Sequence, residues 1–391
     1  MGKENKELYT SESVTVGHPD KVADSISDAI LTEYLSVDEN ARVAVEALVT
    51  TNHVTIAGEV KANEHIDVER VVRDTIIEIG YDKDEYQFNG HTATIDIRLD
   101  EQSSDISQAV DKSDEHIGAG DQGLMFGYAV RETPELMPLP IMLAHWLAMR
   151  LEEVRKKGIV DYLGPDGKTQ VTVEYENDQP VRIHTMLIST QHTDGAQAHE
   201  IERDMCNQVI RPVLIKHNLT HLVDDDTLWL INPSGRFVIG GPHGDVGLTG
   251  RKIIVDSYGS AARIGGGAYS GKDYTKVDRS GAYVSRYIAK NIVAAGLADR
   301  CEVQLAYAIG VAHPVSVNIE TFGTEIIRKD LIMDAVLHVF DLEPIGIRDM
   351  LDLKNVPYNE TSAYGHFGQE NCGLTWEKAD KAHEIIKHLY S

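Results

Sequence analysis

The sequence contains 391 residues, of which 62 are acidic and 37 are basic, so the formal net charge at pH 7 is −25. A surface this acidic repels nucleic acid and anionic lipid at long range, which argues against both as partners. The three cysteines form no CxxC pair, and no apolar run approaches the roughly 20 residues of a membrane span. The polar N-terminus lacks the apolar stretch of a signal peptide, so we expect a cytoplasmic protein.

The predicted elements follow one pattern three times along the chain. A stretch with helical periodicity comes first. Two runs of period-two alternation joined by a turn come next and predict a β-hairpin, and an amphipathic helix follows. In chain order the helix, hairpin and helix lie at 21–35, 41–61 and 66–80, at 138–157, 169–190 and 195–216, and at 280–297, 302–321 and 325–341.

This threefold pattern predicts an α+β fold with three similar domains, each made of a sheet with helices on one face. We place the domains at 5–105, 118–232 and 233–380, with the chain ends and the loop at 102–117 free to cross between them. Helices and hairpins are common, and the three units share little sequence identity. The alternative is therefore that the repetition is a coincidence of pattern.

Segments rich in glycine and charge interrupt the repeated pattern. Glycine permits positive φ and a close approach of the backbone to a ligand, and loops supported by a scaffold are where function concentrates. We therefore expect the chemistry of the protein in these segments. They lie at 9–21, 100–127, 161–168, 232–252 and 263–280.

The string GGGAYSGKD at 265–273 matches the phosphate-loop pattern up to its last position, and Lys276 and Asp278 follow it closely. At that last position Asp273 replaces the Ser or Thr that would bind Mg²⁺, which excludes an ordinary phosphate-loop NTPase. Two interpretations remain. Either the glycine loop and Lys272 meet an anion, or the segment is a surface loop with solvated charges.

The glycine-rich segment around Asp245 is a second candidate. It ends with the adjacent cations Arg251 and Lys252. Near its start, Arg236 and Phe237 offer a guanidinium and an aromatic face, which suit a phosphate or a base. A long turn region with ordinary glycines explains the same composition.

Two short turns each place a carboxylate beside a lysine, namely Asp20 with Lys21 and Asp166 with Lys168. Aspartate suits Mg²⁺ and lysine suits phosphate oxygen, although a capping Asp beside a surface Lys explains either turn equally well. Asp121 lies among the glycines of a further loop. Together these loops predict a Mg²⁺–polyphosphate site, where catalysis consists mainly of positioning and charge neutralisation.

Long strings within these loops resemble one known family. The chain resembles S-adenosylmethionine synthetase over nearly its whole length and in the family's order. Tyr269 and Tyr274 stand where the family pattern has Phe and Pro, but neither removes a charged or metal-binding group, and the loop at 102–117 is less typical. The matching strings are YTSESVTVGHPDKVADSISDAI at 9–30, GAGDQGLMFGYA at 118–129, INPSGRFVIGGPHGDVGLTGRKIIVD at 231–256, GGGAYSGKDYTKVDRS at 265–280 and AYGHFG at 363–368.

The resemblance implies three similar α+β domains around a pseudo-threefold axis. It implies a homotetramer, a dimer of dimers, whose active sites lie at the dimer interface between two subunits. The implied reaction transfers the adenosyl group of ATP to the sulfur of L-methionine and then cleaves the displaced triphosphate to diphosphate and phosphate. The implied cofactors are a pair of Mg²⁺ ions per site and a single K⁺ per subunit.

The resemblance also assigns roles to individual residues, some of which have more than one role. It makes these residues catalytic: His18, Lys168, Asp245, Arg251 and Lys272. It places these residues around ATP: His18, Asp166, Lys168, Arg236, Phe237, Asp245, Arg251, Lys252, Ala268 and Lys272. It places these residues around methionine: Glu59, Gln102, Asp121, Asp245 and Lys276. It gives Mg²⁺ to Asp20 and Asp278 and K⁺ to Glu46, which from its strand position alone is simply a solvent-facing residue.

Two other classes of function use the same loops. A Mg²⁺-dependent phosphotransferase or ATPase would release phosphate from ATP without methionine. A non-catalytic nucleotide-binding regulator would have no need of His18, Asp20 and Asp278. Because all three are present, the regulator is the weaker alternative.

Overall fold

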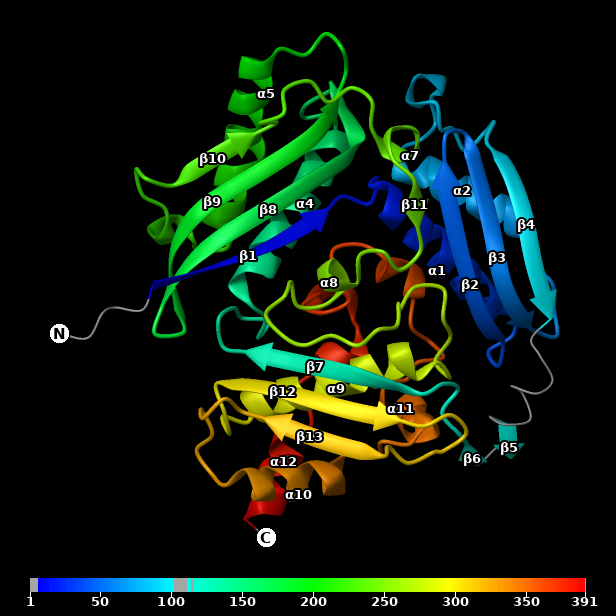
Figure 1. Ribbon diagram of the computed structural model, residues 1–391, viewed down its shortest axis with the longest axis vertical. Coiled ribbons are helices and arrows are strands. Elements are labelled where there is room, and N and C mark those ends of the chain that lie inside the picture. Colours follow the sequence, from blue (N-terminus) through cyan, green and yellow to red (C-terminus); the bar gives the residue numbers. More distant parts are fainter. Residues whose placement is uncertain (1–5, 102–110, 114–115, 391) are drawn as a thin grey trace.

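The computed structural model describes residues 6–101, 111–113 and 116–390. Three larger sheets lie at the top left, right and bottom of the view in Figure 1, with helices between them. Each sheet packs against one long helix, as the predicted units require. The expected α+β class is therefore confirmed.

The first sheet has the strand order β11-β2-β3-β4 and packs on helix α1. In β2 the residues Val43, Val45, Ala47 and Val49 are buried, and the residues between them face away from the helix. The elements of this unit are α1 (Pro19–Val37), β2 (Arg42–Thr50), β3 (His53–Lys61), α2 (Val68–Ile79), η1 (Asp84–Tyr86), β4 (Thr94–Glu101) and β11 (Gly247–Leu248).

The second sheet has the order β1-β8-β9-β10 and packs on α4 around a separate apolar core. Asn177 and Asp178 join β8 to β9 with positive φ values of 52° and 61°, as a tight hairpin turn requires. The elements are β1 (Lys6–Val14), α4 (Leu139–Lys156), β8 (Leu163–Glu176), β9 (Gln179–His192), α5 (Ala198–Asp204), the π-helix η2 (Met205–Ile210), α6 (Arg211–Lys216), η3 (Thr220–Leu222) and β10 (Leu228–Ile231).

The third sheet has the order β13-β12-β7 and packs on α9. Its elements are β7 (Gly123–Val130), α9 (Val277–Ala294), β12 (Arg300–Tyr307), β13 (Ser316–Glu320), α10 (Lys329–Val339), α11 (Pro344–Met350) and α12 (Ala382–Leu389). The short elements are β5 (Asp111–Ser113), β6 (His116–Ile117), α7 (Gly241–Gly244), α8 (Ile253–Asp256), η4 (Tyr358–Glu360), η5 (Glu370–Cys372) and η6 (Thr375–Glu377).

Each larger sheet borrows one strand from a distant part of the sequence. Strand β1 precedes the first unit but pairs with β8, β7 precedes the second unit but pairs with β12, and β11 pairs with β2. The predicted helix–hairpin–helix units are all present, whereas these strand exchanges follow no local pattern. The proposed domain boundaries stay a prediction.

The strand exchanges place the glycine-rich segments between sheets. The chain crosses from the second sheet into the first unit between β1 and α1, and again between β10 and β11. It then passes from β11 to α9, in the third unit, through the segment at 249–276. In Figure 1, β1 runs toward the meeting point of α1 and β11 near the centre of the molecule. In the described residues, no helix combines the length and apolarity that crossing a membrane requires.

Candidate active site

His18 caps the N-terminus of α1 and is only 3% exposed. Its Nδ1 accepts a hydrogen bond of 3.2 Å from the backbone N–H of Asp20. Burial, together with the charges of Lys252 and Lys168, lowers the pKa of His18 to about 3. The ring is therefore neutral, and because Nδ1 accepts, Nε2 carries the proton that the ring can donate.

Asp20 lies in the first turn of α1 and joins the helix to the segment after β11. Its carboxylate accepts from the backbone N–H of Leu248 at 3.1 Å and from Nζ of Lys252 at 2.7 Å, and Arg251 lies 3.6 Å away. Burial by itself raises the pKa of Asp20, but the hydrogen bond and charge of Lys252 outweigh burial and hold the pKa below its usual range. Two predicted phosphate ligands thus meet one predicted metal ligand.

Asp166 lies on β8 and is 5% exposed. Its Oδ2 accepts from the backbone N–H of Gly241 at 2.8 Å, whereas its buried Oδ1 has no hydrogen-bond partner within the part of the chain that the structure describes. Burial raises the pKa of Asp166 to about 6. A buried acceptor without a partner is costly, and a donor group of a ligand would satisfy it.

The other residues predicted for this part of the site are more exposed. Asp245 is exposed, and its carboxylate accepts from the backbone N–H of Val246 at 2.9 Å. Arg236 is exposed and bonds Asp194 at 2.7 Å. Phe237 is half-buried, and its backbone N–H donates to Nε2 of His192 at 3.0 Å.

These residues form the first cluster, to which strand β8 and the crossings of the chain around α1 and β11 contribute; Arg236, whose side chain bonds Asp194, is included as the sequence neighbour of Phe237. Lys168, which is exposed on β8, belongs to it because its charge acts on His18 and Asp166. The first cluster consists of His18, Asp20, Asp166, Lys168, Arg236, Phe237, Asp245, Arg251 and Lys252.

A second cluster forms around the segment before α9. Nζ of Lys272 bonds Asp278 at 2.8 Å, and Nζ of Lys276 bonds Asp273 at 2.6 Å. Asp273 is fully buried and accepts from the backbone N–H of Val43 at 2.7 Å, so it braces the loop. Its carboxylate is held by Lys276 and by the Val43 backbone, so this aspartate is occupied within the protein and does not point out of the loop.

The other residues of the second cluster lie on exposed surfaces. Glu46 on β2 and Glu59 on β3 are exposed, and Glu59 pairs with Ala44, which in turn forms a β-bridge with Lys272. Asp121 is exposed and accepts from the backbone N–H of Gln122. The second cluster consists of Glu46, Glu59, Asp121, Lys272, Lys276 and Asp278.

Two predicted residues fall outside both clusters. Ala268 lies between them, with its methyl group over Gly250, where an added Cβ would come within 2.4 Å of it. Gln102 lies outside the described residues.

The two clusters occupy different positions along α1. The first cluster surrounds Asp20, near the start of the helix. The second lies beside Asp28, which accepts a hydrogen bond of 2.8 Å from the backbone N–H of Gly271, the residue before Lys272. At about 1.5 Å per residue, Asp28 lies roughly 12 Å further along the helix. Among the described residues no group of three or more His, Cys, Asp or Glu side chains is placed to hold a metal ion, and Asp20 and Asp278 are each paired with a lysine. One chain therefore presents the predicted site in two parts.

Comparison with known protein families shows to which family this chain belongs. Models of the N-terminal, central and C-terminal domains of S-adenosylmethionine synthetase match residues 6–104, 116–237 and 239–378 in turn. The chain belongs to the S-adenosylmethionine synthetase family. It is a methionine adenosyltransferase, a transferase that forms S-adenosylmethionine from ATP and L-methionine, and enzymes of this family use metal ions.

Lys21, which the sequence suggested as a phosphate ligand or a surface lysine, is neither in this synthetase, because it is enclosed by two aspartates that were not predicted. Lys21 is fully buried and bonds both Asp24 and Asp256, and Asp24 also accepts from the backbone of Gly250. The spacing of Asp20, Asp24 and Asp28 every four residues on a helix is the signal that would have revealed a shared face. The spacing does not show, however, that these charges are buried, because a single sequence does not distinguish buried charges from surface charges.

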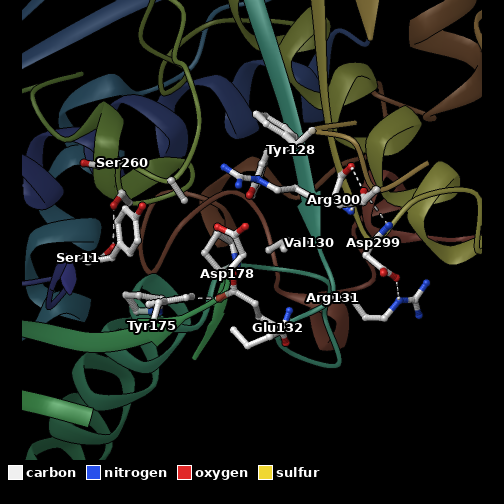
Figure 2. A pocket seen from close by; sticks show the side chains of 18 of the residues that line it. Ser11, Tyr128, Val130, Arg131, Glu132, Tyr175, Asp178, Ser260, Asp299 and Arg300 are labelled. Carbon is white, nitrogen blue, oxygen red and sulfur yellow. Dashed lines mark hydrogen bonds and ion pairs between the residues drawn. The ribbon is translucent and has the colours of Figure 1, made fainter. Parts of the chain in front are cut away.

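The synthetase also contains a cavity of about 410 Å³ between the second and third sheets. Figure 2 shows Tyr128 and Arg300 from the third sheet, Tyr175 and Asp178 from the β8–β9 hairpin, and Glu132 around it. Among the predicted active-site residues that the structure describes, none lines this cavity. The catalytic assignment therefore concerns the two clusters and not this space.

Proposed function

We propose that the active site is completed when the first cluster of one subunit meets the second cluster of another, in a homotetramer built as a dimer of dimers. The observation that carries this proposal is the separation of the clusters along α1, because each contains groups that the other lacks. The first supplies a neutral histidine and phosphate-binding cations. The second supplies Lys272, Lys276 and the carboxylates predicted for methionine.

Apolar side chains on the outer faces of the sheets support an association of subunits. Leu48 on β2, Leu230 on β10 and Leu124 on β7 are at least 37% exposed. Their neighbours along each strand or in its paired strand face the core. These apolar side chains lie on the sheet surfaces opposite the helices, where burial against another protein surface is favourable. A second copy of the chain provides such a surface with matching symmetry.

The proposed chemistry places positive charge where the leaving group develops negative charge. The methionine thioether attacks C5′ of ATP and expels the triphosphate, and since a thioether has no proton to lose, no general base is needed. Nε2–H of His18 donates to the leaving oxygen, and Lys168, Arg251, Lys252 and Lys272 bind phosphate oxygens. Such contacts strengthen as the C–O bond breaks, so they lower the barrier.

We assign the nucleoside to the remaining side chains of the first cluster. Phe237 stacks on adenine, Ala268 lines the nucleotide pocket, and the unpartnered Oδ1 of Asp166 accepts from an ATP hydroxyl. Arg236 contacts the nucleotide, and Asp245 lies at the junction of ATP and methionine. Burial of Asp166 in the free enzyme leaves this acceptor ready for the ligand.

Methionine is assigned to groups that suit an amino acid with a reacting sulfur. Glu59, Gln102, Asp245 and Lys276 hold its charged end or its junction with ATP. Asp121 faces the sulfur, where a nearby carboxylate favours the developing positive charge of the sulfonium.

The donor groups fit the metal ions that we propose. Mg²⁺ is commonly held by one or two carboxylates together with substrate phosphates, and Asp20 and Asp278 each offer one carboxylate beside phosphate-binding lysines. When bound, these ions neutralise triphosphate charge. With the carboxylates occupied in this way, Lys252 and Lys272 would be available to bind phosphate oxygens. We assign K⁺ to the exposed carboxylate of Glu46.

We further propose that the enzyme cleaves the displaced triphosphate to diphosphate and phosphate, with Arg251 as the main contributor, and that it works in the cytoplasm. Arg251 is half-exposed, and its guanidinium is held by a 3.1 Å hydrogen bond to the backbone oxygen of Val246 and by an ion pair of 3.6 Å with Asp20, so few contacts have to break for it to follow the triphosphate. The three cysteines are free thiols, as in a reducing compartment.

One assay tests the reaction. The enzyme is incubated with ATP, Mg²⁺ and K⁺, with and without methionine, and the sulfonium, diphosphate and phosphate are quantified by mass and by phosphate detection. We expect equal amounts of all three products, formed only when methionine is present. Phosphate release at the same rate without methionine would instead indicate a phosphotransferase or ATPase.

A further inference from the structure

Helix α1 presents three aspartates in a row. Asp20, Asp24 and Asp28 are spaced four residues apart, so their side chains follow one side of the helix. Asp24 and Asp28 are completely buried, and Asp20 is 3% exposed. Burying a carboxylate costs free energy unless it is hydrogen-bonded, so all three side chains need partners.

Each of the three carboxylates accepts a backbone N–H from a loop that carries predicted phosphate ligands. Asp20 accepts from Leu248 at 3.1 Å and Asp24 accepts from Gly250 at 2.8 Å, both in the segment that leads to Arg251 and Lys252. Asp28 accepts from Gly271 at 2.8 Å, directly before Lys272. The row thus holds loops of both clusters on one helix.

The two glycines have a backbone conformation that suits this contact. Gly250 has a φ of +80° and Gly271 a φ of +78°, in the left-handed region that favours glycine. A side chain at Gly271 would come within 1.9 Å of the backbone oxygen of Val45. The amides therefore point at the aspartates in a geometry that other residues would disturb.

Neutralising Lys21 does not require Asp24. Lys21 is bonded by both Asp24 and Asp256, so one buried cation faces two buried carboxylates. Burial raises the pKa of Asp24 and raises that of Asp256 to about 7. Because Asp256 by itself would balance Lys21, the contact that distinguishes Asp24 is the one to the Gly250 amide.

We propose that Asp24 and Asp28 are positioning residues for the reaction. They fix Gly250 and Gly271 at a set spacing along α1, and so orient the adjacent cations toward the polyphosphate leaving group. The proposal rests on the proposed function, since it takes these cations to be triphosphate ligands. One helix would then align a loop of one active site with a loop of another.

Asp24 offers the cleaner test, because substituting Asp28 leaves the buried Arg279, which bonds it at 2.7 Å, without its carboxylate. Asp24→Ala removes the acceptor for Gly250. We expect it to resemble Arg251→Ala: hydrolysis of added tripolyphosphate falls about tenfold more than single-turnover formation of the sulfonium, since small displacements of positioned groups have large effects on rate. Asp24→Leu, which fills the same space, serves if the alanine variant fails to fold.

The conservative variant Asp24→Asn separates positioning from charge. It retains an oxygen for the Gly250 amide and leaves a balanced pair of Lys21 and Asp256, so we expect a ratio of the two rates close to that of the wild type. Asp74→Ala, which removes an exposed aspartate of α2 paired with Arg70, is the matched control and should change neither rate.

A double-mutant cycle completes the test. If Asp24 acts through Arg251, the effects of Asp24→Ala and Arg251→Ala on tripolyphosphate hydrolysis will be less than additive. Additive effects, or an Asp24→Ala variant whose two rates fall equally, would overturn the positioning role. If Arg251→Ala itself leaves hydrolysis intact, the assignment of Arg251 in the proposed function fails first, which makes the two failures distinguishable.

Discussion

The two clusters differ in how much of their final geometry a single chain supplies. In the first, His18 and Asp166 are buried and their pKa values are moved by that burial, so their protonation is set before any ligand arrives. In the second, Glu46, Glu59 and Asp121 lie on open surfaces. Burial is what tunes a donor or acceptor, so the buried groups of the first cluster are preorganised, whereas these three carboxylates of the second depend on what covers them.

The largest expected effect comes from His18, at the centre of the preorganised cluster. For His18→Ala we expect single-turnover formation of the sulfonium to fall on the order of 10³-fold, because a positioned donor to the leaving oxygen is lost. Rapid-quench kinetics measures this rate. A loss smaller than tenfold would remove His18 from the reaction.

His18 is also a helix cap, so a control is needed. Losing the cap lowers the free energy of unfolding by about 1 kcal/mol. His18→Asn retains a capping oxygen, and it should regain this stability in chemical denaturation while its rate stays low.

Lys272 tests the open cluster in the same way. Lys272→Ala should lower turnover on the order of 10²-fold, since one phosphate ligand is lost, while the fold is kept because the Lys272 side chain is 23% exposed. Steady-state kinetics and circular dichroism measure the two properties. Lys157→Ala, which removes an exposed lysine of an i,i+4 pair with Glu153, is the matched control. Near-normal kinetics for Lys272→Ala would mean that the glycine loop does not meet ATP.

Arg251 should separate the two steps of the reaction. For Arg251→Ala we expect cleavage of triphosphate to fall about tenfold more than formation of the sulfonium, because this cation is assigned to the second step. Quenched-flow measurement of both products in one experiment gives the ratio. Equal losses in the two steps would contradict the assignment.

The smallest effect is expected at Asp166, and it is an effect on the free energy of unfolding. Its folded-state pKa of about 6 lies above the ordinary value of 3.8, so the folded protein binds the extra proton and stability falls as pH rises through this window. We expect Asp166→Asn to exceed the wild type by about 2 kcal/mol in free energy of unfolding at pH 7 and to match it near pH 4. Urea denaturation at both pH values measures this, and a difference independent of pH would show that Asp166 is not buried as a carboxylate.

The repeated units were predictable from the sequence because the apolar spacing that defines them is local. The hairpin at 41–61, which turns at Asn52, and the helix α1 were both predicted, although the helix begins two residues earlier than expected, at Pro19 behind the His18 cap. The predicted helix at 195–216 is one run interrupted by a π-helical turn. In the third hairpin, a long connection and not a tight turn joins the strand that ends at Tyr307 to the strand that begins at Ser316.

The pairing of distant strands was not predictable. Lys6 pairs with Glu176, and Arg300 with Val130, because tertiary packing selects these partners and leaves no periodic signal. The site shows the same limit. The motifs identified the candidate residues of the site. Their division into two clusters, and the burial of Asp24 and Asp273, depend on strand exchange and were therefore not predictable. The roles assigned to the site residues stay predictions.

One measurement tests the composite site most directly. His18→Ala subunits, altered in the first cluster, are mixed with Lys272→Ala subunits, altered in the second, and exchanged by denaturation and refolding. If the site is shared between subunits, each mixed dimer regains one intact site, and activity rises to roughly a quarter of that of refolded wild type for random pairing. The same mixture of His18→Ala with Lys252→Ala, both in the first cluster, should stay inactive. A mixture of the first pair that is no more active than its parents would show that the two clusters do not meet across an interface.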